Sequence, residues 1–279
     1  MKKIRSISAI IIGFIAISLL LINTVGLFKN IRKEGLLEDT DLRFKNDISL
    51  SYEQAMAATK RRVNESDEAY ARRVTIVVSQ GLAHIDWNQI NDTERYNQLV
   101  PIWENYFIYF MGKFSNIPEY KKYHFANYER SLQRGIGICG DASMVMSQLL
   151  DKQQVKNQLY TFPGHVILSA SFSDGQAQLF DPDFGVILPG DLNKIRAQPE
   201  LIEQAYLKAG YTQDDALGMK KRYQQDYEAW NGVSHFITKK YYFELMAYFL
   251  KWPLPIFLLF LALFLDGRLL ASHFSKQKK

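Results

Sequence analysis

An uncharged apolar stretch near the start of the chain limits the possible topologies more than any other feature. Residues 6–28 form 23 consecutive positions without a charged side chain and are rich in Ile and Leu. A helix of this length can cross a hydrocarbon core of ~30 Å. A cleaved signal peptide is the competing interpretation, but the stretch is longer than a typical signal core and no small-x-small cleavage pattern follows. We therefore expect a transmembrane anchor over residues 1–30.

A second apolar stretch lies close to the other end of the chain. Residues 252–265 carry no charge, but these 14 positions are short for a membrane span. Extending the helix back past Lys251, whose aliphatic stem can reach the membrane interface, gives sufficient length. We expect a second transmembrane helix over 241–270, kinked near Pro253 and Pro255. The alternative is an apolar hairpin that lies on the membrane surface.

The distribution of charge agrees with two membrane-flanking ends. The net charge of the chain is +5, of which residues 1–33 supply +6 and residues 266–279 supply +3, leaving −4 for the body between them. A mildly acidic body with basic ends argues against nucleic acid and for a lipid bilayer as partner, together with other membrane proteins of the cell envelope. By the positive-inside tendency, we expect both termini in the cytoplasm and the body outside the inner membrane.

The rest of the sequence divides into a charged, aperiodic linker over 31–49, a globular domain over 50–240 and a basic tail over 271–279. Helical and strand periodicities occur together in the domain, which predicts the α+β class. The aromatic residues on all sides of 100–114 indicate a buried helix. The expected helices cover 52–63, 67–83, 100–114, 139–150, 191–209 and 213–230, and the expected strands cover 159–162, 165–171 and 176–181.

The only cysteine of the chain stands at the start of an expected helix. It lies in Arg134-Gly-Ile-Gly-Ile-Cys139-Gly-Asp, directly before helix-spaced apolar residues that end at Leu150. A helix N-terminus favours the thiolate, which is the nucleophilic form of a cysteine. The glycines allow close approach of the backbone and leave N–H groups for an oxyanion. A single cysteine also excludes an internal disulfide and any multi-cysteine metal centre.

A histidine and an aspartate flank the hairpin that is expected next. His165 begins one strand and Asp181 ends the following strand. A five-residue loop over 171–175 would place His165 directly opposite Asp181, whereas a two-residue loop would place it opposite residue 184. Either register allows a carboxylate–imidazole hydrogen bond that fixes the histidine tautomer for a nearby thiol. The alternatives are a buried structural cysteine, a structural histidine and an aspartate that ends a strand.

Three segments together resemble the transglutaminase-like branch of the papain-like cysteine enzymes: RGIGICGDASMVMSQLL, PGHVILSAS and LFDPDFG. The resemblance covers about residues 125–190 and implies an α+β core in which a helix packs on a small antiparallel sheet. It also implies that Cys139 is the nucleophile, His165 the general base and acid, and Asp181 the carboxylate that orients the histidine. By the same resemblance Gln133, six residues before the cysteine, is a candidate oxyanion donor.

Two departures from the family pattern leave the substrate class open. Val166 and Ile167 stand where a tryptophan often follows the histidine, and helices rather than further strands are expected over 191–230. The resemblance implies a membrane-anchored cysteine hydrolase or acyltransferase that attacks an amide or ester bond of a protein or peptide-like substrate through a thioacyl intermediate. The alternative is a catalytically inactive descendant that serves as a binding or assembly component of an envelope complex.

Other candidate sites in the sequence are weaker. The remaining histidines, His84, His124, His235 and His273, have no paired ligand spacing, so the sequence predicts neither a metal nor another cofactor. Asp181-Pro-Asp183 matches the DxD pattern of sugar-nucleotide transferases, but no parallel α/β pattern precedes it.

Overall fold

The computed structural model describes residues 2–36, 49–88 and 90–266. Residues 37–48 of the expected linker, the end of the expected second membrane helix and the expected basic tail lie outside these ranges. The chain divides into two compact units. The first unit combines Met1–Ile31, Asn97–Tyr123 and Phe243–Lys279, and the second combines Arg32–Tyr96 with His124–Tyr242.

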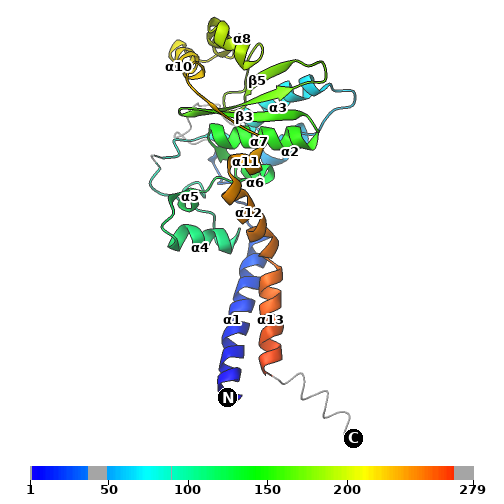
Figure 1. The fold of residues 1–279 in the computed structure, drawn as a ribbon. Coiled ribbons are helices and arrows are strands. Elements are labelled where there is room, and N and C mark those ends of the chain that lie inside the picture. Colours follow the sequence, from blue (N-terminus) through cyan, green and yellow to red (C-terminus); the bar gives the residue numbers. More distant parts are fainter. Residues whose placement is uncertain (1, 37–48, 89, 267–279) are drawn as a thin grey trace. The chain divides into compact units, whose positions relative to one another are not determined.

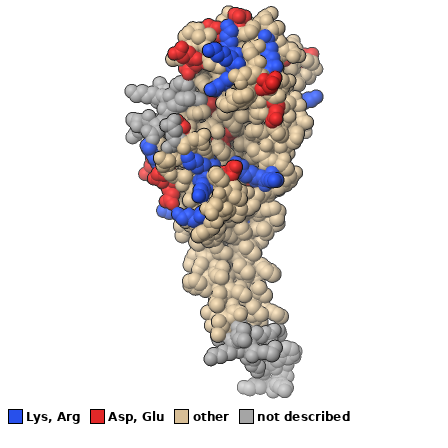
Figure 2. Space-filling model, turned by 60° about the vertical axis from the view of Figure 1, so that its left-hand side comes forward, with Lys and Arg blue, Asp and Glu red and all other residues tan. Residues whose placement is uncertain are grey.

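Two apolar helices dominate the first unit. α1 (Lys2–Gly26) and α13 (Pro253–Asp266) lie side by side and run in opposite directions (Figure 1). Small residues let them approach closely, because a Cβ at Gly13 would lie only 3.5 Å from the Cβ of Ala262. Large apolar side chains cover the outside of the pair, and Figure 2 shows no charged side chain along most of it. Among the described residues, α1 alone is a single helix long and apolar enough to cross a membrane.

The C-terminal apolar region forms two helices instead of the single helix expected over 241–270. α12 (Thr238–Leu250) and α13 meet at a bend of 47°. Together they are long and apolar enough for one crossing, whereas neither is so alone. Pro253 is the first residue of α13, a position where its missing N–H costs no helical hydrogen bond. The predicted kink is therefore a break in front of this proline.

The aromatic stretch 100–114 also differs from the prediction. Its helix, α4, covers only Tyr106–Phe114, because the Asn105 side chain caps it by accepting from the Phe107 N–H at 3.1 Å. Phe110 and Phe114 are 44% and 71% exposed, so the prediction of burial on all sides is wrong. A short helix, α5 (Pro118–Lys121), follows.

A five-stranded antiparallel sheet lies at the centre of the second unit. The strand order is β6-β5-β4-β3-β7, which places β4 in the middle. A middle strand is covered on both faces, and this explains why the β4 sequence is apolar at consecutive positions. The strands are β3 (Lys156–Phe162), β4 (His165–Ser171), β5 (Ala177–Asp181), β6 (Val186–Ile187) and β7 (Glu228–Trp230), and a separate parallel pair joins β1 (Ala83–His84) to β2 (Ile136–Gly137).

Helices cover both faces of this sheet. Leu168 and Phe180 point to one face, whereas Ile167 and Leu179 point to the other, as the alternation along a strand requires. The first face packs against α2 (Tyr52–Ala58), α3 (Asp67–Gly81), α6 (Tyr128–Arg134) and α7 (Cys139–Lys152), and the second against α8 (Leu192–Ala197), α9 (Glu200–Lys208) and α10 (Gln213–Tyr223). The predicted α+β class with a small antiparallel sheet is confirmed.

The region before α11 (Val233–Phe236) differs from its prediction. The sequence predicts helix up to residue 230, but β7 pairs with the edge of β3, with Trp230 opposite Leu159. The Trp230 indole N–H donates to Thr161 Oγ1 at 3.0 Å and fixes this edge pairing. The expectation that helices rather than further strands fill 191–230 is therefore wrong at its end, where β7 forms. The single helix expected over 191–209 is also two helices, because Pro199 separates α8 from α9.

Candidate active site

Cys139 is the first residue of α7 and is half-buried. The chain reaches it through Gly135, whose left-handed φ of 77° ends α6. A Cβ at Gly137 would lie 2.7 Å from the Cβ of Asp141, so glycine is required there. The Asp141 carboxylate accepts from the Ile138 N–H at 3.0 Å and fixes the first turn of the helix. The local sequence thus holds the thiol at a helix N-terminus, as predicted.

His165 and Asp181 form a buried hydrogen-bonded pair at one end of the sheet. His165 Nε2 lies 2.7 Å from Asp181 Oδ2, and both side chains are almost inaccessible. Five residues, 172–176, join the two strands, because Ser171 lies opposite Ala177. Continuing this register places Asp181 opposite Ile167. The pair is therefore diagonal, between the two arrangements that the loop lengths predicted.

The Asp181 carboxylate is held from several sides. Its Oδ2 also accepts from the hydroxyl groups of Tyr206 and Tyr223, the second at 3.2 Å. Its Oδ1 accepts from the main-chain N–H groups of Asp183 and Phe184 at 3.1 and 3.2 Å. Burial, followed by the charge of Asp181, raises the pKa of both tyrosines well above its ordinary value. Both phenols therefore remain donors, and the carboxylate stays fixed toward the histidine.

The Asp181 anion controls the charge of His165. Burial by itself lowers the pKa of the imidazole, but the charge and hydrogen bond of Asp181, with a contribution from Cys139, outweigh burial and raise that pKa to about 10. Because Nε2 faces Asp181, Nδ1 is the ring nitrogen available to the thiol. A ring nitrogen of His165 lies within 4.8 Å of Cys139 Sγ. An imidazolium at this distance favours a thiolate, which is the reactive form.

Two further histidine–aspartate pairs lie beside these residues, and the sequence predicted neither. His84 Nδ1 lies 2.8 and 3.1 Å from the two carboxylate oxygens of Asp183. His124 Nδ1 lies 2.7 Å from Oδ2 of Asp141, in the first turn of α7. Both histidines therefore have a carboxylate partner, although the sequence shows no paired ligand spacing around them. The short parallel pairing of β1 with β2 brings His84 next to Gly137, and no local pattern signals a contact across 99 positions of sequence.

The candidate oxyanion donor Gln133 lies near the end of α6. Its main-chain carbonyl accepts from Arg32 Nε at 3.4 Å, and no described hydrogen bond connects its amide to Cys139. A role for Gln133 therefore stays a prediction from the resemblance. The first N–H groups of α7 provide another source of donors, because the first turn of a helix has no intrahelical acceptors for them.

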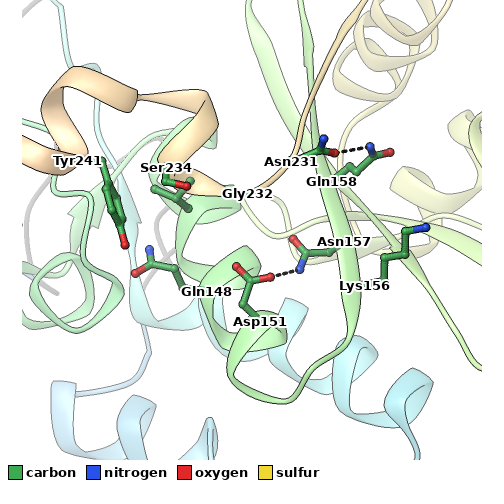
Figure 3. Close-up of a pocket in the computed structure, with 10 residues that line it drawn as sticks. Gln148, Asp151, Lys156, Asn157, Gln158, Asn231, Gly232, Ser234 and Tyr241 are labelled. Carbon is green, nitrogen blue, oxygen red and sulfur yellow. Dashed lines mark hydrogen bonds between the residues drawn. The ribbon is translucent and has the colours of Figure 1, made fainter.

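A cleft of about 670 Å³ lies at the opposite end of α7 (Figure 3). Most of its lining side chains are amides and hydroxyls: Gln148, Asn157, Gln158, Asn231, Ser234 and Tyr241. Gln158 Nε2 donates to Asn231 Oδ1 at 2.6 Å, and Asn157 Nδ2 donates to Asp151 Oδ1 at 2.7 Å. Gln148 is nine residues beyond Cys139, which corresponds to about 13 Å along the helix. The lining of the cleft contains neither a thiol nor an imidazole, so we assign the chemistry to the Cys139 end.

Comparison with known proteins identifies no relative: no family model, no curated protein and no solved structure matches the chain. The functional conclusion therefore rests on the geometry of the site. The fold brings together the three residues singled out in the sequence, Cys139, His165 and Asp181. A thiol at a helix N-terminus, an imidazole beside it and a carboxylate that orients the imidazole are the components of nucleophilic acyl transfer.

Proposed function

We propose that this protein is a membrane-anchored cysteine hydrolase or acyltransferase with a transglutaminase-like core. The observation that carries the proposal is the position of Cys139 at the start of α7, beside a His165 whose Nε2 is 2.7 Å from Asp181. The packing of α7 on the antiparallel sheet, with histidine at the start of β4 and aspartate at the end of β5, supports the finer fold assignment.

Acylation begins when the Cys139 thiolate attacks the carbonyl carbon of an amide or ester and forms a carbon–sulfur bond. The carbonyl oxygen becomes an oxyanion, and N–H groups in the first turn of α7 are the donors that stabilise it. The His165 imidazolium gives its Nδ1 proton to the leaving amine or alcohol as the carbon–nitrogen or carbon–oxygen bond breaks. The products of this step are a thioacyl-enzyme, a neutral imidazole and the released leaving group.

Deacylation reverses the direction of proton transfer. A water molecule or an amine attacks the thioester, and the His165 Nδ1 accepts its proton. The carbon–sulfur bond breaks and restores the thiolate beside an imidazolium. Asp181 stabilises that imidazolium and keeps Nδ1 directed at the thiol, while Tyr206 and Tyr223 hold the carboxylate in place. Water is the default acceptor, so hydrolysis of a protein or peptide-like substrate is the first expectation.

The proposal places the enzyme in the inner membrane. α1 serves as the anchor, and the bent pair of α12 and α13 forms a second crossing. The basic residues at both ends then favour cytoplasmic termini and an extracytoplasmic second unit. A reporter that is active only in the cytoplasm, fused after Lys279, should be active, and an export-dependent reporter at the same position should be silent. The opposite pattern would contradict this topology.

Covalent labelling by an electrophilic amide probe tests the chemistry on the full-length protein in detergent micelles. The native protein should react about tenfold or more faster than the same protein unfolded in urea, because only the fold places His165 beside the thiol. Cys139→Ala should abolish labelling, and His165→Ala should lower the rate to that of the unfolded chain. His235→Ala is the matched control, since that histidine lies outside the site, where its Nδ1 accepts from the Asn231 main-chain N–H.

Equal labelling rates for the native and unfolded protein would contradict the enzyme proposal. The same result would favour the alternative of an inactive binding or assembly component, because that role requires the fold but no activated thiol. A reduced rate in His235→Ala as large as that in His165→Ala would show that the effect is not specific to the site.

A further inference from the structure

A third group lies beside the cysteine and histidine and has no part in the proposed acyl transfer. Cys139 Sγ, a ring nitrogen of His165 and a carboxylate oxygen of Asp183 all lie within 4.8 Å of one another. We propose that these three side chains form a binding site for a divalent transition-metal ion, Zn²⁺ in the first instance. Asp183 separates this proposal from the acyl-transfer triad, because the triad uses Asp181 instead.

The donor set is the one that zinc prefers. Thiolate, imidazole and carboxylate are its usual protein ligands, and three protein ligands with one open position are typical of accessible zinc sites. With Zn–S near 2.3 Å and Zn–N and Zn–O near 2.0–2.2 Å, the ligand atoms of a tetrahedral site lie roughly 3.3–3.8 Å apart. The present limit of 4.8 Å exceeds this by about 1 Å, a difference that small side-chain rotations can remove.

The residues that hydrogen-bond to two of the three ligands are also of the kind found around metal sites. A histidine that binds zinc commonly donates its second ring N–H to a carboxylate, and His165 faces Asp181 in this way at 2.7 Å. A carboxylate ligand is commonly hydrogen-bonded itself, and His84 Nδ1 lies 2.8 Å from Asp183 Oδ1. Asp181 and His84 thus orient one ligand each. Asp183 is buried, whereas Cys139 is half-buried, which leaves the thiol side as the path of entry.

Metal binding has a consequence for the chemistry, and this consequence rests on the proposed function. Zinc would hold the Cys139 sulfur as a thiolate and occupy the Nδ1 lone pair of His165. One proton leaves the cysteine–histidine pair on binding and passes to solvent. The nucleophile and the general base would then be coordinated, so the metal-bound form cannot carry out acyl transfer. We therefore expect Zn²⁺ to inhibit the enzyme. Asp183, which helps to bind the metal, lies outside the catalytic triad.

The test uses untagged full-length protein in detergent, stripped of metal with a chelator. Co²⁺ reports thiolate ligation through a charge-transfer band in the near ultraviolet, and Zn²⁺ should displace it with one equivalent per chain. Asp183→Asn keeps the shape of the side chain and should weaken Zn²⁺ binding by roughly tenfold or more. Cys139→Ala should remove the charge-transfer band. Asp174→Asn is the control, because that aspartate lies in the β4–β5 turn, where it caps the Gln176 N–H.

Labelling with the electrophilic probe provides the second measurement. Zn²⁺ should protect the wild-type thiol, and the concentration needed for half protection should rise roughly tenfold or more in Asp183→Asn. The metal-site proposal fails if the wild type binds Zn²⁺ no more tightly than Asp183→Asn, or if Cys139→Ala retains the cobalt band. Zinc binding without any accelerated labelling of the metal-free protein would instead overturn the proposed enzyme and leave the metal site standing.

Discussion

Two aspartates at opposite ends of α7 have pKa values shifted in opposite directions. Asp141 lies in the first turn, two residues after the cysteine, and Asp151 lies in the last turn, at the open cleft. Burial opposes ionisation of Asp141, but His124, Arg134 and the Ile138 N–H outweigh burial and hold its pKa below the ordinary value. Burial raises the pKa of Asp151, and a single hydrogen bond from Asn157 only partly offsets it.

The two ends of α7 differ in how well they stabilise a negative charge, such as a thiolate or an oxyanion. The N-terminal end has N–H groups without intrahelical acceptors and the positive end of the helix dipole. The two histidine–carboxylate pairs of Asp141 and Asp181 add charge-assisted hydrogen bonds there. The C-terminal end borders a cleft, but among the described residues only a hydrogen bond from Asn157 offsets the effect of burial on its carboxylate. The position of charged and hydrogen-bonding partners, rather than the presence of a cleft, therefore identifies the end of α7 suited to catalysis.

Replacing an aspartate by asparagine at each end is the strongest test of this comparison. Asp181→Asn removes the charge that stabilises the His165 imidazolium, so we expect labelling of Cys139 at neutral pH to fall about 100-fold. Asp151→Asn, at the cleft, should leave the labelling rate unchanged. Pseudo-first-order rates with the electrophilic probe measure both. Equal losses in the two variants would mean that the two ends of α7 do not differ in the way proposed.

The pH dependence of stability tests the His165–Asp181 pair directly. The folded pKa of His165 is raised to about 10, above its ordinary 6.5, so its stabilisation is complete below pH 6.5 and is lost as the pH rises toward 10. The free-energy advantage of the wild type over His165→Gln should shrink by about 1.4 kcal/mol per pH unit in this window, or about 5 kcal/mol in total. Urea unfolding at several pH values measures it. A difference in unfolding free energy that does not change with pH would contradict the ion pair of His165 and Asp181.

Asp141→Asn should destabilise the protein by about 2 kcal/mol at pH 7, because it leaves the part-buried His124 and the buried Arg134 without their anion. The advantage of the wild type should decrease below pH 4, since the folded pKa of Asp141 is lowered. Asp151→Asn should cost less than about 0.5 kcal/mol or stabilise slightly. Chemical denaturation of both variants at pH 7 and pH 3.5 makes the comparison. A larger loss of unfolding free energy in Asp151→Asn than in Asp141→Asn would contradict the proposed difference between the two ends of α7.

The smallest effect is expected in the cleft of Figure 3. Asn231→Ala removes the acceptor of the Gln158 amide, but this pair is exposed and water can replace it. We expect a change in unfolding free energy within about 0.5 kcal/mol and an unchanged labelling rate. A loss of labelling comparable to that of Asp181→Asn would show that the cleft takes part in the chemistry.

Local sequence determined the elements that present the predicted residues. Glycines before Cys139 and helix-spaced apolar residues after it fix the start of α7, and α1 follows from an uninterrupted apolar run. The hairpin of β4 and β5 follows from an apolar strand and an alternating strand on the two sides of a turn with Asp174-Gly175. These signals are short-range, because a helix or a hairpin is made by residues that are neighbours in the chain.

Only the tertiary structure decided which distant side chains join the site. His84 meets Asp183 through a parallel pairing, and Tyr206 and Tyr223 reach Asp181 from two helices on the second face of the sheet. The same holds for β7, where pairing with the open edge of β3 overrides a local helical pattern. A buried carboxylate needs hydrogen-bond donors, and tertiary packing supplies them from distant parts of the chain. Such contacts leave no periodic pattern in the sequence.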